Sequence, residues 1–135
     1  MKTVICYVST VNPFLTQKEL QQLFSFVTNT NKKLGITGVL IHAEGNFFQI
    51  IEGETTTIHS LFERIQQDTR HYDIITILNK PIYNSSFDDY ECSFTVISTK
   101  KDREKLDSFL EKEKLNNPQS FGSIAYIAQK FIGKY

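Results

Sequence analysis

The sequence of 135 residues predicts an α+β fold, in which a five-stranded mixed sheet carries two helices on each face. Segments of alternating hydrophobicity, typical of strands, interchange with segments whose apolar residues recur every three or four positions, typical of helices. A hydrophobic content of 40% is enough for the core of one domain. No apolar run reaches the ~20 residues that a membrane-spanning helix requires.

The chain opens with an alternating, β-rich segment, residues 3–9, which predicts the first strand. A helix follows, because Thr16 and Glu19 have the spacing of a capping box. Three residues form the apolar stripe of this helix: Leu20, Phe24 and Val27. The next position on the stripe is Asn31, so a polar side chain ends an apolar seam, and Gly35 then stops the helix.

A hairpin and a second helix come next. Residues 36–43 and 47–52 predict two strands, because a Glu-Gly-Asn turn separates them. Period-two alternation places Phe47, Gln49 and Ile51 on one face of the second of these strands and Phe48, Ile50 and Glu52 on the other. The helix is expected from about residue 56 to 68, with Arg64 and Asp68 on one edge of its apolar face.

Two further strands are predicted at residues 73–78 and 90–98. The order up to residue 98 is the split βαβ pattern of a ferredoxin-like sheet with one additional strand. Right-handed crossovers place both helices on one face. Two C-terminal helices are expected to cover the other face, one at about residues 102–114 and one opened by Asn117 as cap and Pro118. The apolar residues of the last helix are Phe121, Ile124, Ala128 and Phe131.

Composition narrows the possible functions. Fifteen basic and fifteen acidic residues cancel, which argues against nucleic acid and anionic membranes as partners. The two cysteines, Cys6 and Cys92, lie in strand-like segments and are expected to be reduced, and the three histidines are scattered, so no metal site is predicted. The N-terminal segment lacks a signal-peptide pattern, which predicts a cytoplasmic location.

Two polar residues are expected to meet on the central strands. Tyr7 lies on the first strand and Gln49 on the third, and these strands pair in a ferredoxin-like sheet. A buried amide without partners costs roughly 1–3 kcal/mol, so Gln49 is either a structural pin or a ligand contact.

The two helices add further polar residues. Asn31 ends the first helix and Arg64 and Asp68 edge the second, so a slot between two parallel helices could hold a planar ligand. Arg64, Arg70 and His71 are expected near one end, where a phosphate could bind.

Each of these residues also has a purely structural interpretation. Tyr7 and Gln49 could satisfy each other within a core, and Asn31 could be a helix C-cap. Arg64 and Asp68 could form a surface ion pair worth under about 1 kcal/mol, and the Arg-His dipeptide after them a solvated turn. Taken singly, the structural interpretations are favoured, but their convergence on one slot favours a ligand.

The sequence resembles the BLUF family, flavin-based blue-light sensors, over roughly residues 3–98. The resemblance rests on motifs in a specific order and spacing. They are Tyr7-Val8-Ser9, Asn31 before Gly35-Ile36-Thr37-Gly38, Phe47-Phe48-Gln49-Ile50-Ile51-Glu52-Gly53, Ile65-Gln66-Gln67-Asp68-Thr69-Arg70-His71, and Pro81-Ile82 before Phe87.

The resemblance implies a noncovalent flavin, FAD or FMN, between the two helices. Tyr7 corresponds to the redox-active tyrosine of the family, Gln49 to the switching glutamine, and Asn31 to a hydrogen-bond partner of the flavin ring. The residues expected to hold or frame the ribityl and phosphate end are Arg64, Asp68, Arg70 and His71.

The sequence departs from the family at the fifth strand, where the family usually carries Trp-x-Met linked to signal output. Tyr90 and Cys92 stand at these positions, and the chain has no tryptophan and no methionine except Met1. We therefore expect the photochemistry to be retained and the output route to differ.

The implied function is that of a short blue-light receptor. Residues 1–98 are expected to be the photosensory domain and residues 99–135 a helical extension that packs on the sheet. Such a protein is not expected to be an enzyme, but to signal to an unknown downstream protein and to self-associate. The alternatives are a flavin-free binding module and an acylphosphatase-like enzyme, although the loop after the first strand, Val11-Asn12-Pro13-Phe14, lacks the glycines and arginine of a phosphate cradle.

Overall fold

A computed structural model describes residues 1–85, 87, 94–116 and 118–134, without the side chains of residues 118–121. The predicted α+β class with a five-stranded mixed sheet is confirmed. In chain order the elements are β1 (Lys2–Val11), α1 (Gln17–Lys33), β2 (Thr37–Ala43), β3 (Asn46–Glu54), α2 (Thr55–Gln67), β4 (His71–Ile82), β5 (Phe94–Ile97), α3 (Lys100–Asn116) and α4 (Pro118–Ile132).

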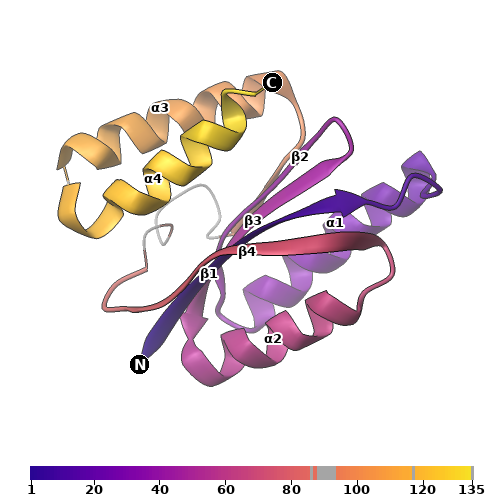
Figure 1. The fold of residues 1–135 in the computed structure, drawn as a ribbon, viewed down its shortest axis with the longest axis horizontal. Helices are drawn as coiled ribbons and strands as arrows, with labels where there is room; N and C mark the ends of the chain where they lie inside the picture. Colours follow the sequence, from indigo (N-terminus) through magenta and orange to yellow (C-terminus); the bar gives the residue numbers. More distant parts are fainter. Residues whose placement is uncertain (86, 88–93, 117, 135) are drawn as a thin grey trace.

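The sheet has the strand order β4-β1-β3-β2-β5, with β5 parallel to β2 and every other pair antiparallel. Helices α1 and α2 cover one face and α3 and α4 the other, so the molecule has three layers (Figure 1). The two central strands, β1 and β3, place Tyr7 directly opposite Gln49. The predicted central pairing is therefore confirmed.

The ends of α1 explain why Asn31 is placed as it is. The capping box is formed, since the Thr16 hydroxyl accepts from the Glu19 N–H at 3.1 Å and the Glu19 carboxylate accepts from the Thr16 N–H at 2.9 Å. At the other end Gly35 has φ +69°, and the N–H of Ile36 donates to the Asn31 carbonyl at 2.9 Å. The backbone carbonyl of Asn31 therefore closes the helix, and its side chain takes no part in the cap.

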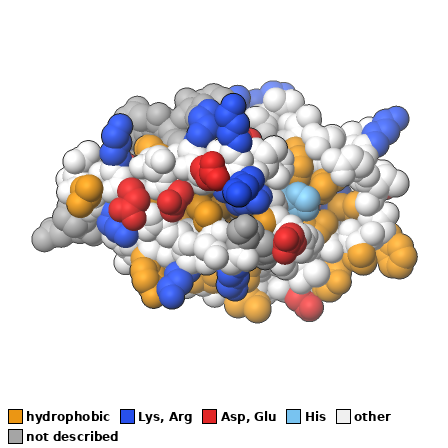
Figure 2. All heavy atoms as spheres, turned by 90° about the horizontal axis from the view of Figure 1, so that it is seen from above, with side chains coloured by type: hydrophobic (Ala, Val, Ile, Leu, Met, Phe, Trp, Pro, Cys, Tyr) orange, Lys and Arg blue, Asp and Glu red, His pale blue; other side chains and the backbone are white. Residues whose placement is uncertain are grey.

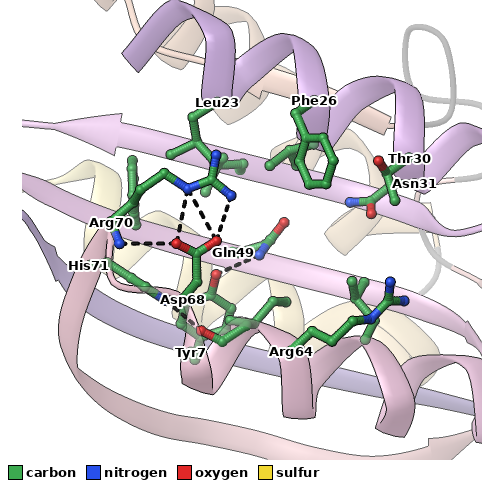
Figure 3. Close-up of a pocket in the computed structure, with 15 residues that line it drawn as sticks. Tyr7, Leu23, Phe26, Thr30, Asn31, Gln49, Arg64, Asp68, Arg70 and His71 are labelled. Atoms are coloured by element: carbon green, nitrogen blue, oxygen red, sulfur yellow. Dashed lines mark hydrogen bonds and ion pairs between the residues drawn. The ribbon is translucent and has the colours of Figure 1, made fainter. Parts of the chain in front are cut away.

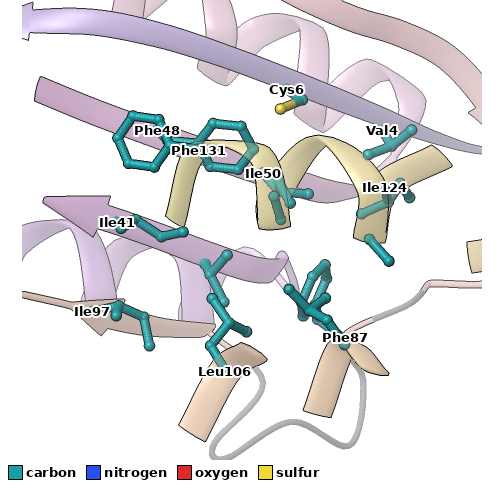
Figure 4. Close-up of a cluster of buried hydrophobic side chains, with 14 of the residues drawn as sticks. Val4, Cys6, Ile41, Phe48, Ile50, Phe87, Ile97, Leu106, Ile124 and Phe131 are labelled. Carbon is teal, nitrogen blue, oxygen red and sulfur yellow. The ribbon is translucent and has the colours of Figure 1, made fainter. Parts of the chain in front are cut away.

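The sheet separates two hydrophobic cores. One lies against α1 and α2, and the other lies against α3 and α4 (Figure 4). In the second core the rings of Phe48 and Phe131 stack with their centroids 5.0 Å apart, and Ile124 is buried, as predicted. Cys6 is a buried free thiol of this core, and burial raises its pKa. The predicted cap Asn117 and the side chain of Phe121 lie outside the described residues.

Strand β4 is longer than the predicted residues 73–78. It continues through Pro81 because it is an edge strand, where a missing N–H breaks no ladder on the outer side. Most of its side chains are exposed on both faces, so its sequence carries no alternation beyond Leu78. The fifth strand is observed at Phe94–Ile97, and residues 90–93 of the prediction lie outside the described part of the chain.

Figure 2 shows the molecule from the side of α3 and α4. Acidic and basic side chains lie next to one another on this face, as expected for the charge-rich segment of α3. Among the described residues no helix is long and apolar enough to cross a membrane. The same residues contain no group of three His, Cys, Asp or Glu side chains that could hold a metal ion.

Candidate functional site

A cavity of about 210 Å³ lies between α1 and α2, with the central strands as its floor (Figure 3). It collects seven of the predicted site residues, and the remaining two, Tyr90 and Cys92, lie outside the described residues. The seven are Tyr7, Asn31, Gln49, Arg64, Asp68, Arg70 and His71. The remaining lining is largely apolar and consists of Leu23, Phe26, Val27, Thr30, Leu40, Phe47, Leu61 and Ile65.

Tyr7 and Gln49 form a hydrogen-bonded pair on the floor of the cavity. Their side chains are 3% exposed each, and the Gln49 amide nitrogen donates to the Tyr7 hydroxyl oxygen at 2.5 Å. Burial raises the pKa of Tyr7, although the bond from Gln49 opposes the shift, so the phenol stays neutral at physiological pH. The Gln49 Oε1 atom is buried and has no hydrogen-bond partner among the described residues.

Asn31 presents a second unpaired amide. Its side chain is 2% exposed, and its Nδ2 atom is buried without a partner among the residues described. The structural interpretation of Asn31 as a C-cap is wrong, because the cap residue is Leu34. Figure 3 shows the Asn31 and Gln49 amides turned toward each other across the cavity. Buried polar groups are nearly always paired, so one donor and one acceptor here are available to a bound molecule.

Asp68 and Arg70 form the polar edge of the cavity. The Asp68 carboxylate accepts from the Arg70 backbone N–H at 3.0 Å and from its guanidinium at 2.6 to 3.2 Å. The guanidinium holds the pKa of Asp68 below its usual range, and the carboxylate raises that of Arg70. The Arg70 guanidinium carbon lies 5.5 Å from the centre of the Phe26 ring, so the pair reaches from the end of α2 to α1.

Arg64 lines the cavity as expected, but the prediction that it lies at the same end as Arg70 and His71 is wrong. Figure 3 places it toward the Asn31 end, whereas Arg70 and His71 lie at the opposite end. The reason is the direction of the helices. Since α1 follows β1 and α2 follows β3, and these strands are antiparallel, the helices run side by side in opposite directions rather than parallel. No Arg64–Asp68 ion pair forms, because Asp68 pairs with Arg70.

His71 lines the cavity, but its ring nitrogens bond to other residues of the protein and are not free to bind a phosphate. Its Nε2 lies 2.7 Å from the Ile65 carbonyl oxygen, which can only accept, so Nε2 carries the proton and donates. In the neutral ring Nδ1 then accepts from the Ser9 hydroxyl at 2.8 Å. The imidazole ring lies edge-on to Tyr7, with the ring centres 6.0 Å apart. Both nitrogens are thus engaged within the protein.

Sequence reasoning missed three residues that the structure makes important. Ser9 could have been found, because it lies two positions after Tyr7 on the same strand face. Phe26 is 56% exposed and lies off the predicted apolar stripe, so no pattern marked it. Glu52 was placed on the opposite face from Gln49, but its complete burial has no sequence signal.

The donor set defines a class of ligand. Apolar side chains from both helices enclose a slot, and an amide donor and an amide acceptor lie buried within it. A planar heteroaromatic ring with carbonyl oxygens and N–H groups along one edge, such as the isoalloxazine of a flavin, fits this arrangement. The fold and site thus define a ferredoxin-like module with a cavity suited to a planar heteroaromatic cofactor.

The family profile described as "Sensors of blue-light using FAD" matches residues 3–93. The chain therefore belongs to the BLUF family, which confirms the resemblance seen in the sequence. It is 31% identical over 85 residues to the photoactivated adenylate cyclase subunit beta of Euglena longa, and the match covers 63% of this chain. The chain spans only 10% of the length of that relative.

Two solved structures are similar to this chain, one over nearly its whole length and one over about three quarters of it. BlrB, a BLUF protein in its dark state, is 27% identical, with a TM-score of 0.71 over 99% of this chain and 97% of BlrB. Klebsiella pneumoniae BlrP1, solved with FMN and cyclic diGMP, is 31% identical, with a TM-score of 0.64 over 73% of this chain and 26% of BlrP1.

Replacing Asp68 by asparagine is expected to weaken flavin binding about tenfold, because the charge-assisted bonds that hold the Arg70 guanidinium beside the cavity are lost. The dissociation constant of added FMN or FAD can be measured by the quenching of flavin fluorescence. The matched control is Glu63→Gln, which removes the same charge from an exposed position of α2. Equal affinities of the Asp68→Asn variant and the control would contradict the assigned role of the ion pair.

Proposed function

We propose that residues 1–98 are a photosensory domain that holds FAD or FMN noncovalently between α1 and α2. The observation that carries this proposal is the pair of buried, unpartnered amide atoms, Asn31 Nδ2 and Gln49 Oε1, beside the hydrogen-bonded Tyr7. Asn31 would donate through Nδ2 to a carbonyl oxygen of the ring, and Gln49 would contact the ring edge. The Asp68–Arg70 pair and Arg64 frame the two ends of the bound molecule.

The photochemistry follows from the residue types on the cavity floor. A bound flavin supplies the chromophore and, once excited by blue light, a strong oxidant. Tyr7 would be the residue that donates an electron to the excited flavin, and it would do so from its neutral form, since burial disfavours a charged tyrosinate. Gln49 would accept the proton through its amide oxygen, which must turn toward the phenol because the nitrogen end donates to Tyr7 in this structure. Return of both electron and proton to Tyr7 would leave no net redox change.

The lasting change is a new hydrogen-bond arrangement of Gln49. By rotation or by tautomerisation, the amide side chain would present a donor to a ring carbonyl in place of its hydrogen bond to Tyr7. The 2.5 Å bond to Tyr7 supports this assignment, because the two side chains move within one hydrogen-bonded unit. An added donor at that carbonyl shifts the flavin absorption to longer wavelength without a covalent bond.

Residues 99–135 are proposed to pass the signal to a downstream protein. Helices α3 and α4 form a layer on the face of β3 opposite the flavin cavity, which supports this role. The outer side of the layer carries mixed charges and is available for contact with a partner or a second copy (Figure 2). Self-association, a sensory rather than enzymatic role, and a cytoplasmic location belong to the same proposal.

The acylphosphatase-like alternative gains no support from the loop after β1. The polar side chain in this loop, Asn12, accepts from the Phe14 N–H at 3.0 Å and donates to the Thr69 carbonyl at 3.2 Å. These bonds hold the loop against the turn before β4 rather than leave its polar groups for a phosphate.

The purified protein is expected to be yellow or to become yellow with added FAD or FMN. Blue light is expected to shift its flavin bands to longer wavelength, with recovery in the dark. Absorption spectra before, during and after illumination test both statements. A protein that takes up neither flavin, or whose bound flavin shows no reversible shift, would overturn the proposed function.

A further inference from the structure

A fully buried carboxylate lies on β3, three residues beyond Gln49 and on the opposite face of the sheet. Glu52 is 0% exposed, and its neighbours across the sheet are Val4 on β1 and Thr37 on β2. A buried carboxyl group needs hydrogen-bond partners, because an unpaired polar group in the protein interior is costly. Glu52 takes no part in the cavity, so its burial calls for a separate explanation.

Two donors converge on one oxygen of Glu52. The Thr37 hydroxyl donates to Oε1 at 3.0 Å, and the backbone N–H of Phe87 donates to the same atom at 3.0 Å. Thr37 belongs to the neighbouring strand of the sheet, whereas Phe87 lies 35 residues away in the connection between β4 and β5. The second bond therefore ties this connection to the central strand that carries Gln49.

Phe87 continues the contact into the helical layer. Its side chain is 0% exposed within the second core, together with Leu106 and Leu110 of α3. Its ring lies 5.9 Å from the ring of Phe109, also on α3. Figure 4 shows Phe87 beside Leu106 in this core. A continuous set of contacts thus runs from Gln49 along β3 to Glu52, then to Phe87 and α3.

We propose that Glu52 is a positioning residue that couples β3 to the C-terminal helical layer through the Phe87 N–H. This inference rests on the proposed function, because it concerns how the light signal leaves Gln49. A small displacement of β3 carries the Glu52 side chain with it, and the Phe87 backbone follows, since separation would break a buried hydrogen bond. Phe87 then shifts its contacts with α3. The coupling uses neither a tryptophan nor a methionine, and the chain has none at the family's usual positions.

The test compares two readouts in the full chain loaded with FMN. The flavin red shift reports the photochemistry, and the light-minus-dark difference in amide hydrogen exchange of α3, measured by mass spectrometry, reports the output. Glu52→Met keeps the length of the side chain but removes the acceptor for Phe87. We expect this variant to retain the red shift and to lower the exchange difference below about a third of the wild-type value.

Two further variants separate coupling from loss of stability. Thr37→Val removes the hydroxyl donor to Glu52 but leaves the bond to Phe87, so it is expected to retain the exchange difference. Glu52→Gln keeps an acceptor oxygen of lower strength and is expected to retain about half of the difference. If Glu52→Met does not bind flavin, the Glu52→Gln variant is used for the test instead. A wild-type light-minus-dark exchange difference of α3 in Glu52→Gln would then overturn the proposal.

The remaining outcomes are also decisive. A full exchange difference in Glu52→Met, an equal loss in Thr37→Val, or a wild-type red shift without any change in α3 would overturn the coupling role of Glu52. Absence of the red shift in the wild-type protein would overturn the proposed function itself. The two failures are therefore distinguishable within one set of samples.

Discussion

Replacing Tyr7 by phenylalanine is expected to abolish the light-induced red shift while the flavin stays bound. The substitution removes the hydroxyl that bonds to Gln49 at 2.5 Å but keeps the ring that packs 5.8 Å from Phe62. Among the described residues that line the cavity, no other tyrosine could donate an electron with a proton, so the quantum yield of the shift should fall at least about 100-fold. Difference spectroscopy under blue light measures it.

The matched control for this variant is Tyr72→Phe, which removes a hydroxyl from a tyrosine of β4 that is 46% exposed. The Tyr72→Phe variant should show the same light-induced red shift of the flavin bands as the wild type. Gln49→Leu is expected to bind flavin and to lose the shift as well, because the relay between the phenol and the ring is gone. A normal shift in either Tyr7→Phe or Gln49→Leu would refute the role assigned to that residue.

Gly38→Ala is expected to destabilise the protein by at least about 3 kcal/mol or to prevent folding. Gly38 lies inside β2 with φ +141°, a backbone conformation that L side chains rarely adopt. An added Cβ would overlap the carbonyl oxygen of Ile50 and lie 2.9 Å from its carbonyl carbon. Since this contact is with the backbone of β3, relief requires the sheet itself to move. Urea unfolding monitored by circular dichroism measures the loss.

Gly122→Ala provides the matched control, because Gly122 lies in α4 and an added Cβ there meets no atom of the described residues within 4 Å. Alanine in a helix is favoured over glycine by about 1 kcal/mol, so this variant should be as stable as the wild type or more so. A midpoint for Gly38→Ala close to that of the control would show that β2 and β3 can separate, contrary to the packing.

Local sequence patterns predicted the fold and much of the site. The capping box at Thr16 and Glu19 forms as expected, because both partners lie within one helical turn. The alternation around Gln49 predicted its face correctly, since side chains on a strand can point in only two directions. Asn31 was expected at the end of the apolar stripe of α1, and in the structure it is buried there at 2% exposure. The importance of Gly38 was visible only as part of a family motif, because its close approach to Ile50 depends on the assembled sheet.

The prediction for Arg64 and Asp68 was wrong because it assumed that helix α2 continues to Asp68. The spacing of Arg64 and Asp68 predicts contact only while both residues are helical. Helix α2 ends at Gln67, and Asp68 has an extended ψ of 120°, so its carboxylate turns to Arg70 instead. The partners of His71 and Glu52 were not predictable for a different reason. Ser9 is 62 residues from His71 and Phe87 is 35 from Glu52, and no local pattern encodes such pairs.

The two-faced sequence of β3 also limits how the strand can respond to light. Phe47, Gln49 and Ile51 face α1 and α2, and the residues between them face α3 and α4. A slip of one position, about 3.3 Å along the strand, would turn every side chain to the opposite side. It would carry Gln49 away from Tyr7 and move Phe48 from its stack with Phe131 into the cavity. The register of β3 is therefore fixed. Any displacement along the strand that transmits the signal is smaller than the rise of one residue, about 3.3 Å.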